Sequence, residues 1–442
     1  MPILPCTHPL PLAPPSRRLP GLADPRVELL PNGAQVVQLP LPEAPLVCLD
    51  FWCRAGSVYE RPEESGLAHF LEHMVFKGSE GLDAGEFDRR IEAMGGNSNA
   101  ATGFDDVHYH VLIPPAAAAD ALDLLLELVL EPRLEAEAFQ LERQVVLEEL
   151  AQSEDQPDEV ALQQLLLKAC GPHAYGQPIL GRREALLQHT PASMGAFQQR
   201  LYGANTCVLA LSGALDPSFD SQQTDTDAGL LARRLREGAL ARLATVPEPA
   251  PRPLLSVQPG LHRIALPRLE SARLLMLWGL PPAHELHAVM GADLLTTVLA
   301  EGRRSRLVER LREDLRIVES VDLDLHVLEC GSFALLEAIC EEPDLPLVRQ
   351  TIGEVWQDLA EAGMAAEEWL RAQRLVANGY RFGLESAGGV AATIGSNLLW
   401  RRRHGLDAPL AEISRWTAPE LQARTLPLLD PALACVLEAV PA

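Results

Sequence analysis

The stretch GLAHFLEHMVFKGSE, residues 66–80, places two histidines in an otherwise apolar segment. Its apolar residues recur at helical spacing and predict a helix over about 64–77 that packs on a core. His69 and His73 are four positions apart, so both imidazoles project from one side of that helix, close enough to bind one ion. The apolar stripe of the helix consists of Leu67, Leu71, Met74 and Val75.

Glu72 lies one position before the second histidine. At about 100° per residue it sits roughly 60° round the helix from His69, so it can approach a metal-activated water without being a ligand. Zinc suits this set, since two neutral imidazoles and a carboxylate leave a fourth position for water. A helix with two partly exposed histidines and a glutamate fits the segment equally well, so the hypothesis requires a third ligand.

Carboxylates occur in a second helical stretch, LERQVVLEELAQSED, residues 141–155. Glu142 and Glu149 are seven positions apart, which is two helical turns, so they share a face, whereas Glu148 points elsewhere. Acidic residues are common on solvated helices, and this stretch alone is weak evidence for a ligand.

Composition limits the partners. The 442 residues carry a formal charge of −24, from 37 basic and 61 acidic residues, which argues against nucleic acid or anionic lipid as the main partner. No apolar run reaches the ~18 residues needed to span a bilayer. The eight cysteines are scattered without a CxxC pair, which favours buried thiols in a reducing compartment. We therefore expect a cytoplasmic protein.

Strand and helix patterns alternate in two successive runs. VELLPNGAQVVQLP, residues 27–40, predicts a hairpin around Asn32-Gly33, and later segments predict strands beside helices, so the fold class is α+β. The second half repeats the order of the first, which indicates two similar domains, each an antiparallel-rich mixed sheet packed on one side by helices. The predicted boundaries are a disordered segment over 1–24, a metal-binding domain over 25–219, a linker with a helix over 220–253, and a second domain over 254–442.

Several segments together resemble one family. HFLEHMVFKGSE carries the H-x-x-E-H pattern of the pitrilysin-type zinc peptidases, the inverzincins. The two-domain branch related to mitochondrial processing peptidase is the most similar. The resemblance covers about residues 25–440 and also rests, in order, on LPNGAQVV, RAGSVYE, GGNSNAATGFDDVHYH, ERQVVLEEL, GQPILG and RRSRLVERLRED.

The resemblance implies roles for individual residues. His69 and His73 would bind one zinc ion per chain, with Glu149, 76 residues beyond His73, as third ligand. Glu142 would support the site from outside the metal's ligands, and Glu72 would be the general base that takes a proton from the attacking water. The family's substrate-binding edge strand corresponds to Asn99, Ala100 and Ala101, whose backbone would add the peptide as an extra strand.

One departure concerns the second domain. Family members with a self-sufficient site carry an arginine and a tyrosine seven residues apart that act on the substrate carbonyl. Arg312 fits the first position, but Glu319 occupies the second. A carboxylate cannot replace a phenol as donor to a developing oxyanion unless it is protonated. We expect an inactive second domain and a heterodimer with a related chain that carries the Arg/Tyr pair, with a homodimer as the alternative.

The resemblance thus implies a zinc endopeptidase that hydrolyses oligopeptides or unfolded precursor segments. The competing interpretation is a non-catalytic assembly subunit, as in some relatives. Two other histidine groups are expected to have no metal role. His284 and His287 should be solvated residues at a helix start, and His108 and His110 should point to opposite faces of a strand.

Overall fold

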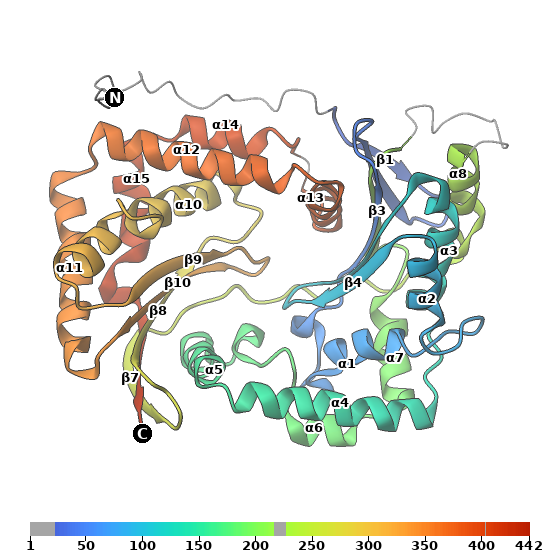
Figure 1. The fold of residues 1–442 in the computed structure, drawn as a ribbon, viewed down its shortest axis with the longest axis horizontal. Helices are drawn as coiled ribbons and strands as arrows, with labels where there is room; N and C mark the ends of the chain where they lie inside the picture. Colours follow the sequence, from blue (N-terminus) through green and yellow to red (C-terminus); the bar gives the residue numbers. More distant parts are fainter. Residues whose placement is uncertain (1–22, 216–226, 403) are drawn as a thin grey trace, which may run out of the picture.

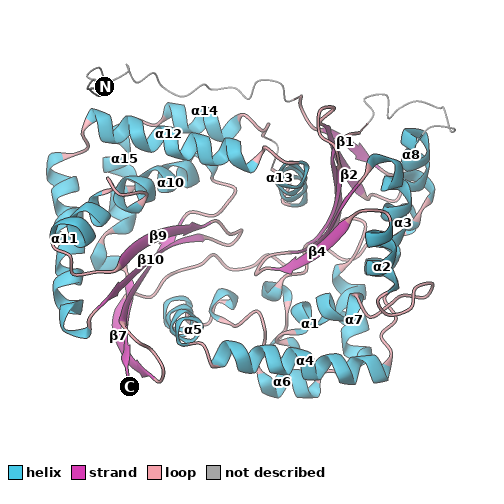
Figure 2. Ribbon diagram, viewed as in Figure 1, coloured by secondary structure: helices cyan, strands magenta, loops and turns pink. Residues whose placement is uncertain are grey.

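The computed structural model describes residues 23–215, 227–402 and 404–442, so all but the last two residues of the predicted disordered segment 1–24, and part of the predicted linker, lie outside the described residues. The described chain forms two halves, each built around one mixed sheet (Figures 1 and 2). The two sheets face each other, and most of the helices lie on their outer sides (Figure 2). We call the side of each sheet that faces the other sheet its inner face. Among the described helices none is both long and apolar enough to cross a membrane.

The first sheet has six strands and contains the predicted hairpin. In that hairpin Leu29 pairs with Gln35, which confirms the turn expected at Asn32-Gly33. The pairing of β2 with β6 is parallel and the other pairings are antiparallel. In sheet order the strands are β1 (Arg26–Leu29), β2 (Gln35–Pro40), β6 (Cys207–Gly213), β3 (Val47–Cys53), β5 (Val107–Ile113) and β4 (Asn97–Thr102).

The second sheet repeats this arrangement without the strand that corresponds to β1. Again one pair of strands, β7 and β11, is parallel, and the others are antiparallel. Because the same connection order recurs in both sheets, the predicted duplication of one fold is confirmed. In sheet order the strands are β7 (Gly260–Leu266), β11 (Cys435–Pro441), β8 (Ala272–Leu280), β10 (Ser332–Cys340) and β9 (Ser320–His326).

Where apolar residues recur strongly at helical spacing in the sequence, the observed helices lie close to the predicted ranges. In the first half they are α1 (Leu67–Val75), α2 (Glu86–Ala93), α3 (Ala118–Leu130), α4 (Ala136–Glu154), α5 (Pro157–Cys170), α6 (Arg183–Gln188) and α7 (Pro191–Leu201), followed by α8 (Asp227–Glu237) and α9 (Ala239–Arg242). In the second half they are α10 (Leu286–Ala300), the π-helical segment η5 (Val308–Asp314), α11 (Leu345–Ala362), α12 (Ala366–Gly383), α13 (Ala387–Leu399), α14 (Ala408–Arg415) and α15 (Ala418–Arg424).

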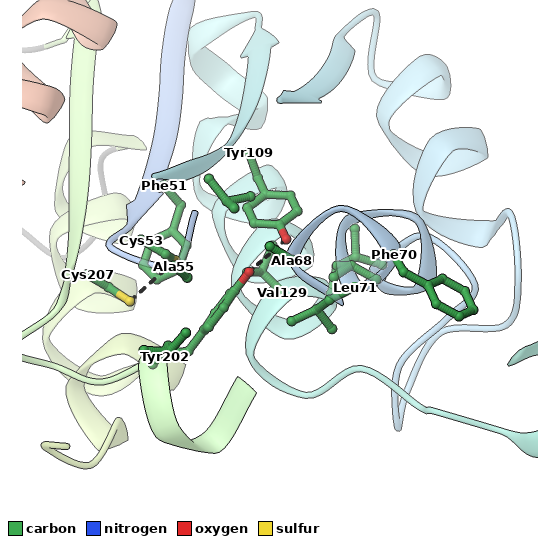
Figure 3. Close-up of a cluster of buried hydrophobic side chains, with 14 of the residues drawn as sticks. Phe51, Cys53, Ala55, Ala68, Phe70, Leu71, Tyr109, Val129, Tyr202 and Cys207 are labelled. Carbon is green, nitrogen blue, oxygen red and sulfur yellow. Dashed lines mark hydrogen bonds between the residues drawn. The ribbon is translucent and has the colours of Figure 1, made fainter. Parts of the chain in front are cut away.

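Alternation along the strands divides the first sheet into two apolar faces. Phe51 and Tyr109 point outward into the core that includes α1 and α3, and the Tyr109 hydroxyl lies 3.0 Å from that of Tyr202 (Figure 3). The intervening residues, such as Trp52, point to the inner face. His108 and His110 lie together on that inner face. The expectation that they point to opposite faces was wrong, because side chains two positions apart on a strand share a face.

Each half places one helix on the inner face of the other half's sheet. Helix α13, from the second half, packs on β2, β3 and β6 through residues such as Val390 and Ile394. Helix α5, from the first half, packs on β8 and β11 (Figure 1). The expectation of helices on one side of each sheet therefore omitted an exchanged helix on the inner side.

Buried polar contacts also join the halves. Asp105, between β4 and β5, accepts a hydrogen bond from the Tyr175 hydroxyl at 2.7 Å and another from the backbone N–H of Glu329 at 2.9 Å. Glu329 lies in the turn between β9 and β10, and Arg402 forms an ion pair with its side chain. Asp105 is only 5% exposed, so water competes little for these contacts. They therefore fix the position of the first half of the chain against the second.

Candidate metal centre

The start of α1 is fixed by backbone geometry. Gly66 has φ +82°, and a Cβ at this position would lie 2.6 Å from the carbonyl oxygen of Leu180, so a larger residue is excluded. The Glu60 carboxylate accepts hydrogen bonds from the N–H groups of Gly66 and Ala68 at 2.9 and 2.8 Å. These bonds satisfy donors that a helix start leaves free. The predicted apolar stripe of α1 is completely buried, which orients the helix.

Three candidate ligands converge between α1 and α4. Nε2 of His69 lies 3.7 Å from Oε1 of Glu149, and Nε2 of His73 lies 3.4 Å from its Oε2. These separations are too long for hydrogen bonds, but ligand atoms placed tetrahedrally at about 2.0–2.1 Å from a zinc ion are about 3.4 Å apart. The donor set and its spacing therefore fit a zinc ion without rearrangement of the helices.

Glu142 fixes the orientation of the second histidine. Its Oε1 lies 2.9 Å from Nδ1 of His73, and its Oε2 lies 2.7 Å from the Lys77 ammonium. Glu142 is 6% exposed, so this carboxylate is held firmly between the two partners. When Nδ1 of His73 donates to Glu142, the lone pair of Nε2 faces the candidate metal position, as is common for metal-binding histidines. Glu148 is exposed, as expected from its helical position.

His69 is suited to act as a neutral ligand. The residue is 8% exposed, and burial, with a smaller contribution from His73, lowers its pKa to about 4. Its Nδ1 is buried, and none of the described residues hydrogen-bonds to it. A neutral imidazole offers a lone pair to a metal without first losing a proton.

Glu72 points toward the same space from α1. Its carboxylate accepts a hydrogen bond from the Thr102 hydroxyl at the end of β4. Burial raises the pKa of Glu72 despite that bond. Sequence reasoning missed Thr102, and no local signal could have identified it, because its role depends on the approach of β4 to α1.

The candidate ligands open into a cavity of about 510 Å³ whose lining includes His69, Glu72 and Glu149. Ala101 and Thr102 of β4 also line it. Of the predicted substrate-binding residues, Ala101 therefore borders the candidate metal centre. Strand β4 is at the edge of the sheet, with Asn99 and Ala101 exposed. The Ala100 N–H donates to the Asn99 side chain at 2.9 Å.

A second cavity, of about 550 Å³, adjoins the first, and the two share four lining residues: Ser153, Glu159, Ile179 and Leu180. It is lined by both halves of the chain. Leu162 and Leu166 of α5 form one side, and Phe333 and Leu335 of β10 belong to the other. The closure of the halves on each other therefore creates an apolar space beside the candidate metal position.

Arg312 is not brought to this site within the chain. It lies in η5, where its guanidinium pairs with Glu313 at 2.9 Å, and it is absent from the described residues that line either cavity. Glu319 is exposed just before β9. The expectation about His287 is only partly met. Its side chain is 29% exposed, but it also stacks on Trp416 and pairs with Glu412 at 2.7 Å.

Comparison with known families finds two successive matches along the chain. Residues 36–183 match the model described as Insulinase (Peptidase family M16), and residues 189–376 match the model described as Peptidase M16 inactive domain. The chain belongs to the M16 peptidase family. This confirms the resemblance to the pitrilysin-type peptidases and their two-domain organisation.

M16 relatives extend over nearly the whole chain. A Mycobacterium leprae protein named as an uncharacterized zinc protease is 27% identical over 403 residues, which cover 91% of this chain and 88% of that protein. YmxG of Bacillus subtilis, also named an uncharacterized zinc protease, is 26% identical over 412 residues, covering 92% and 96%.

Solved structures share the M16 fold. A protease from Helicobacter pylori superposes with a TM-score of 0.83 at 22% identity, covering 94% of this chain and 99% of that chain. A structure from Pseudomonas fluorescens, described as a peptidase M16 inactive domain, gives a TM-score of 0.82 at 19% identity, covering 95% and 98%.

Proposed function

We propose that this M16 protein is a zinc-dependent endopeptidase that hydrolyses oligopeptides or unfolded precursor segments. The observation that carries the proposal is the convergence of His69, His73 and Glu149, whose facing atoms lie 3.4 and 3.7 Å apart. These three residues would hold the ion. When bound, zinc supplies Lewis-acid chemistry, which makes water a nucleophile near neutral pH and polarises a carbonyl group.

The chain's own residues would then handle protons and orientation. Glu72 accepts the proton of the attacking water and passes it to the leaving amine, and Thr102 holds the Glu72 carboxylate in place through its hydroxyl. Glu142 keeps the His73 ring in position. This division of roles needs no residue of the second half for activation of the water.

A peptide in extended conformation would bind along β4. Edge strands present unpaired backbone groups, and a peptide that pairs with them gains affinity without a fixed sequence. Asn99, Ala100 and Ala101 would provide this edge. To use the Ala100 N–H, the peptide would have to displace the Asn99 side chain, which now accepts from it.

The adjoining cavity would receive an apolar side chain of the peptide. Its lining by leucine and phenylalanine from α5 and β10 supports a preference for large apolar residues near the cleaved bond. Three glutamates and two arginines also line the cavity, so its charged residues have both signs: Glu154, Glu159, Glu184, Arg182 and Arg183.

The proposal includes a heterodimer in which a related chain provides the Arg/Tyr pair that Glu319 interrupts. Arg312 would then serve substrate binding only in an assembly that brings it to a site. A cytoplasmic location is also proposed. It is supported by the seven cysteines that the structure describes, all of them free thiols and six of them buried. The alternative is a non-catalytic assembly subunit. Such a subunit would have no need of the candidate ligands and Glu72, all of which are present.

Paired variants test the proposal. His73→Ala should lose the tightly bound zinc, measured by elemental analysis after dialysis, and with it peptide cleavage. Glu72→Gln should retain zinc but lose turnover, because an amide cannot accept the proton. A Glu72→Gln protein with undiminished peptidase activity would exclude Glu72 as the base. A wild-type protein that binds no zinc under conditions that load known zinc enzymes would refute the proposed function.

A further inference from the structure

A second group of potential metal ligands lies on strands β3 and β5, on the inner face of the first sheet, whereas the ligands of the first centre lie on helices α1 and α4. Asp50 of β3 pairs in register with His110 of β5, and His108 is two positions before His110 on the same strand. One ligand atom from each of these three residues lies within 4.8 Å of the others. Asp50 is 2% exposed, whereas both histidines are half-buried.

The ring of His108 is held in one orientation. Its Nδ1 lies 2.9 Å from Oδ1 of Asp50, and it stacks on Trp52 with ring centroids 4.1 Å apart. The Asp50–His108 contact has the same length as the Glu142–His73 contact of the first centre. If Nδ1 of His108 and Asp50 both bind one ion, the metal displaces the proton between them, and their 2.9 Å separation is close to the about 3.4 Å between ligand atoms of a tetrahedral zinc ion.

The two histidine rings form an arrangement that suits chelation. His108 and His110 are nearly parallel, with an interplanar angle of 19° and centroids 5.7 Å apart. Parallel rings on one strand present their nitrogen atoms to the same side of the sheet. Imidazole nitrogens together with a buried carboxylate are typical ligands for zinc and similar divalent transition metals.

We propose that Asp50, His108 and His110 form a second binding site for a divalent transition metal such as zinc. It shares no ligand with the first centre. The site lies one strand inside β4, where Asn99 pairs with His110 and Ala101 pairs with His108. An ion there stands beside the strand proposed to bind peptides. Binding is weaker than at the first centre, because Asp50 and His108 already satisfy each other and this contact must be shared with the metal.

Zinc binding in a His73→Ala background tests this inference, because the first centre is then incomplete. Zinc chloride is titrated into the purified full-length variant near neutral pH, with bound metal measured by equilibrium dialysis. One equivalent should bind to His73→Ala, and the additional substitution His110→Ala should abolish it. Asp50→Asn should weaken it at least tenfold. His284→Ala, which removes an exposed histidine, is the matched control and should leave the titration unchanged.

Each other outcome would overturn the inference. Absence of zinc binding in His73→Ala would show that Asp50 and His108 only hydrogen-bond to each other and that His110 merely lies beside them. Binding that survives both His110→Ala and His110→Asn would assign the metal to other residues. Circular dichroism and melting temperature establish that the variants are folded, and His110→Asn provides a second polar replacement if the alanine variant is unstable. If instead the wild-type protein bound no zinc at the first centre, that result would count against the proposed function and not against this second site.

Discussion

The carboxylate of Glu142 on α4 lies 2.9 Å from Nδ1 of His73 on α1, so one helix fixes the imidazole of another. Glu142→Gln should weaken zinc binding by about 10–100-fold, because groups that orient metal ligands have effects of this size. The amide can still contact His73, but it loses the charge that also holds Lys77. Competition with a calibrated chelator measures the change in zinc affinity.

Glu148→Gln is the control for this variant, since it removes a carboxylate from an exposed position of the same helix. Zinc affinity should be unchanged in that control. If Glu142→Gln removed the tightly bound zinc as completely as His73→Ala, Glu142 would have to be counted as a direct ligand.

Asp105 gives the contact between the halves a dependence on pH. Burial raises the pKa of Asp105 from 3.8 to about 7, whereas in the unfolded chain it titrates near its ordinary value. The folded state therefore holds the proton more tightly, so the contribution of Asp105 is fully present below about pH 4 and is lost as pH rises through about 7. Wild-type protein should lose stability over this range relative to Asp105→Asn, as measured by melting temperature at a series of pH values.

The variant Tyr175→Phe tests the hydrogen bond to Asp105 separately from the titration of Asp105. It removes the hydroxyl that donates to Asp105 and accepts from the N–H of Cys330, and it should cost about 1–3 kcal/mol because buried polar partners are left unsatisfied. A pH dependence identical in wild type and Asp105→Asn would mean that another group titrates there.

The exchanged helix α13 packs on the first sheet through a glycine. A Cβ at Gly395 would lie 2.7 Å from two atoms of the Trp52 ring and 3.0 Å from Cβ of Ala210. Gly395→Ala should therefore destabilise the protein by about 1–3 kcal/mol through overpacking. At Gly379, on the exposed side of α12, a Cβ would meet no atom within 4 Å. Gly379→Ala should instead stabilise by about 0.5–1 kcal/mol through helix propensity. Denaturant unfolding of both variants tests the contrast, and equal effects would show that α13 does not pack tightly on Trp52.

Local sequence patterns predicted many of the helices and strands of the first half, because each such pattern depends on residues that are close in the sequence. The helix at 67–75 follows from its apolar stripe, and the spacing of Glu142 and Glu149 places both on one face of α4. Family resemblance was still needed to choose Glu149 as third ligand, since acidic residues on helices are common.

Contacts between distant segments could not be predicted in this way. Nothing in residues 387–399 indicates that this helix packs on a sheet of the other half, and the meeting of Asp105 with Tyr175 and Glu329 depends on how the halves close. The error over His108 and His110 was different, because strand alternation, correctly applied, places them on one face.

The last prediction concerns Glu319, which occupies the position where self-sufficient relatives are expected to have a tyrosine. The isolated protein should bind zinc but cleave peptides slowly, because loss of one preorganised oxyanion donor lowers the rate by about 10²–10³-fold. Some residual activity should remain, since the candidate ligands and Glu72 are in place within one chain.

A related chain with an intact Arg/Tyr pair should restore turnover and co-purify with this protein. The rate of peptide cleavage is measured for each chain alone and for the mixture, with Glu72→Gln in this chain as the control that must stay inactive in the mixture. If a purified homodimer is fully active, another donor in this chain takes the place of the tyrosine. A partner that binds without raising the rate would favour the assembly-subunit interpretation, because association would then have no catalytic consequence.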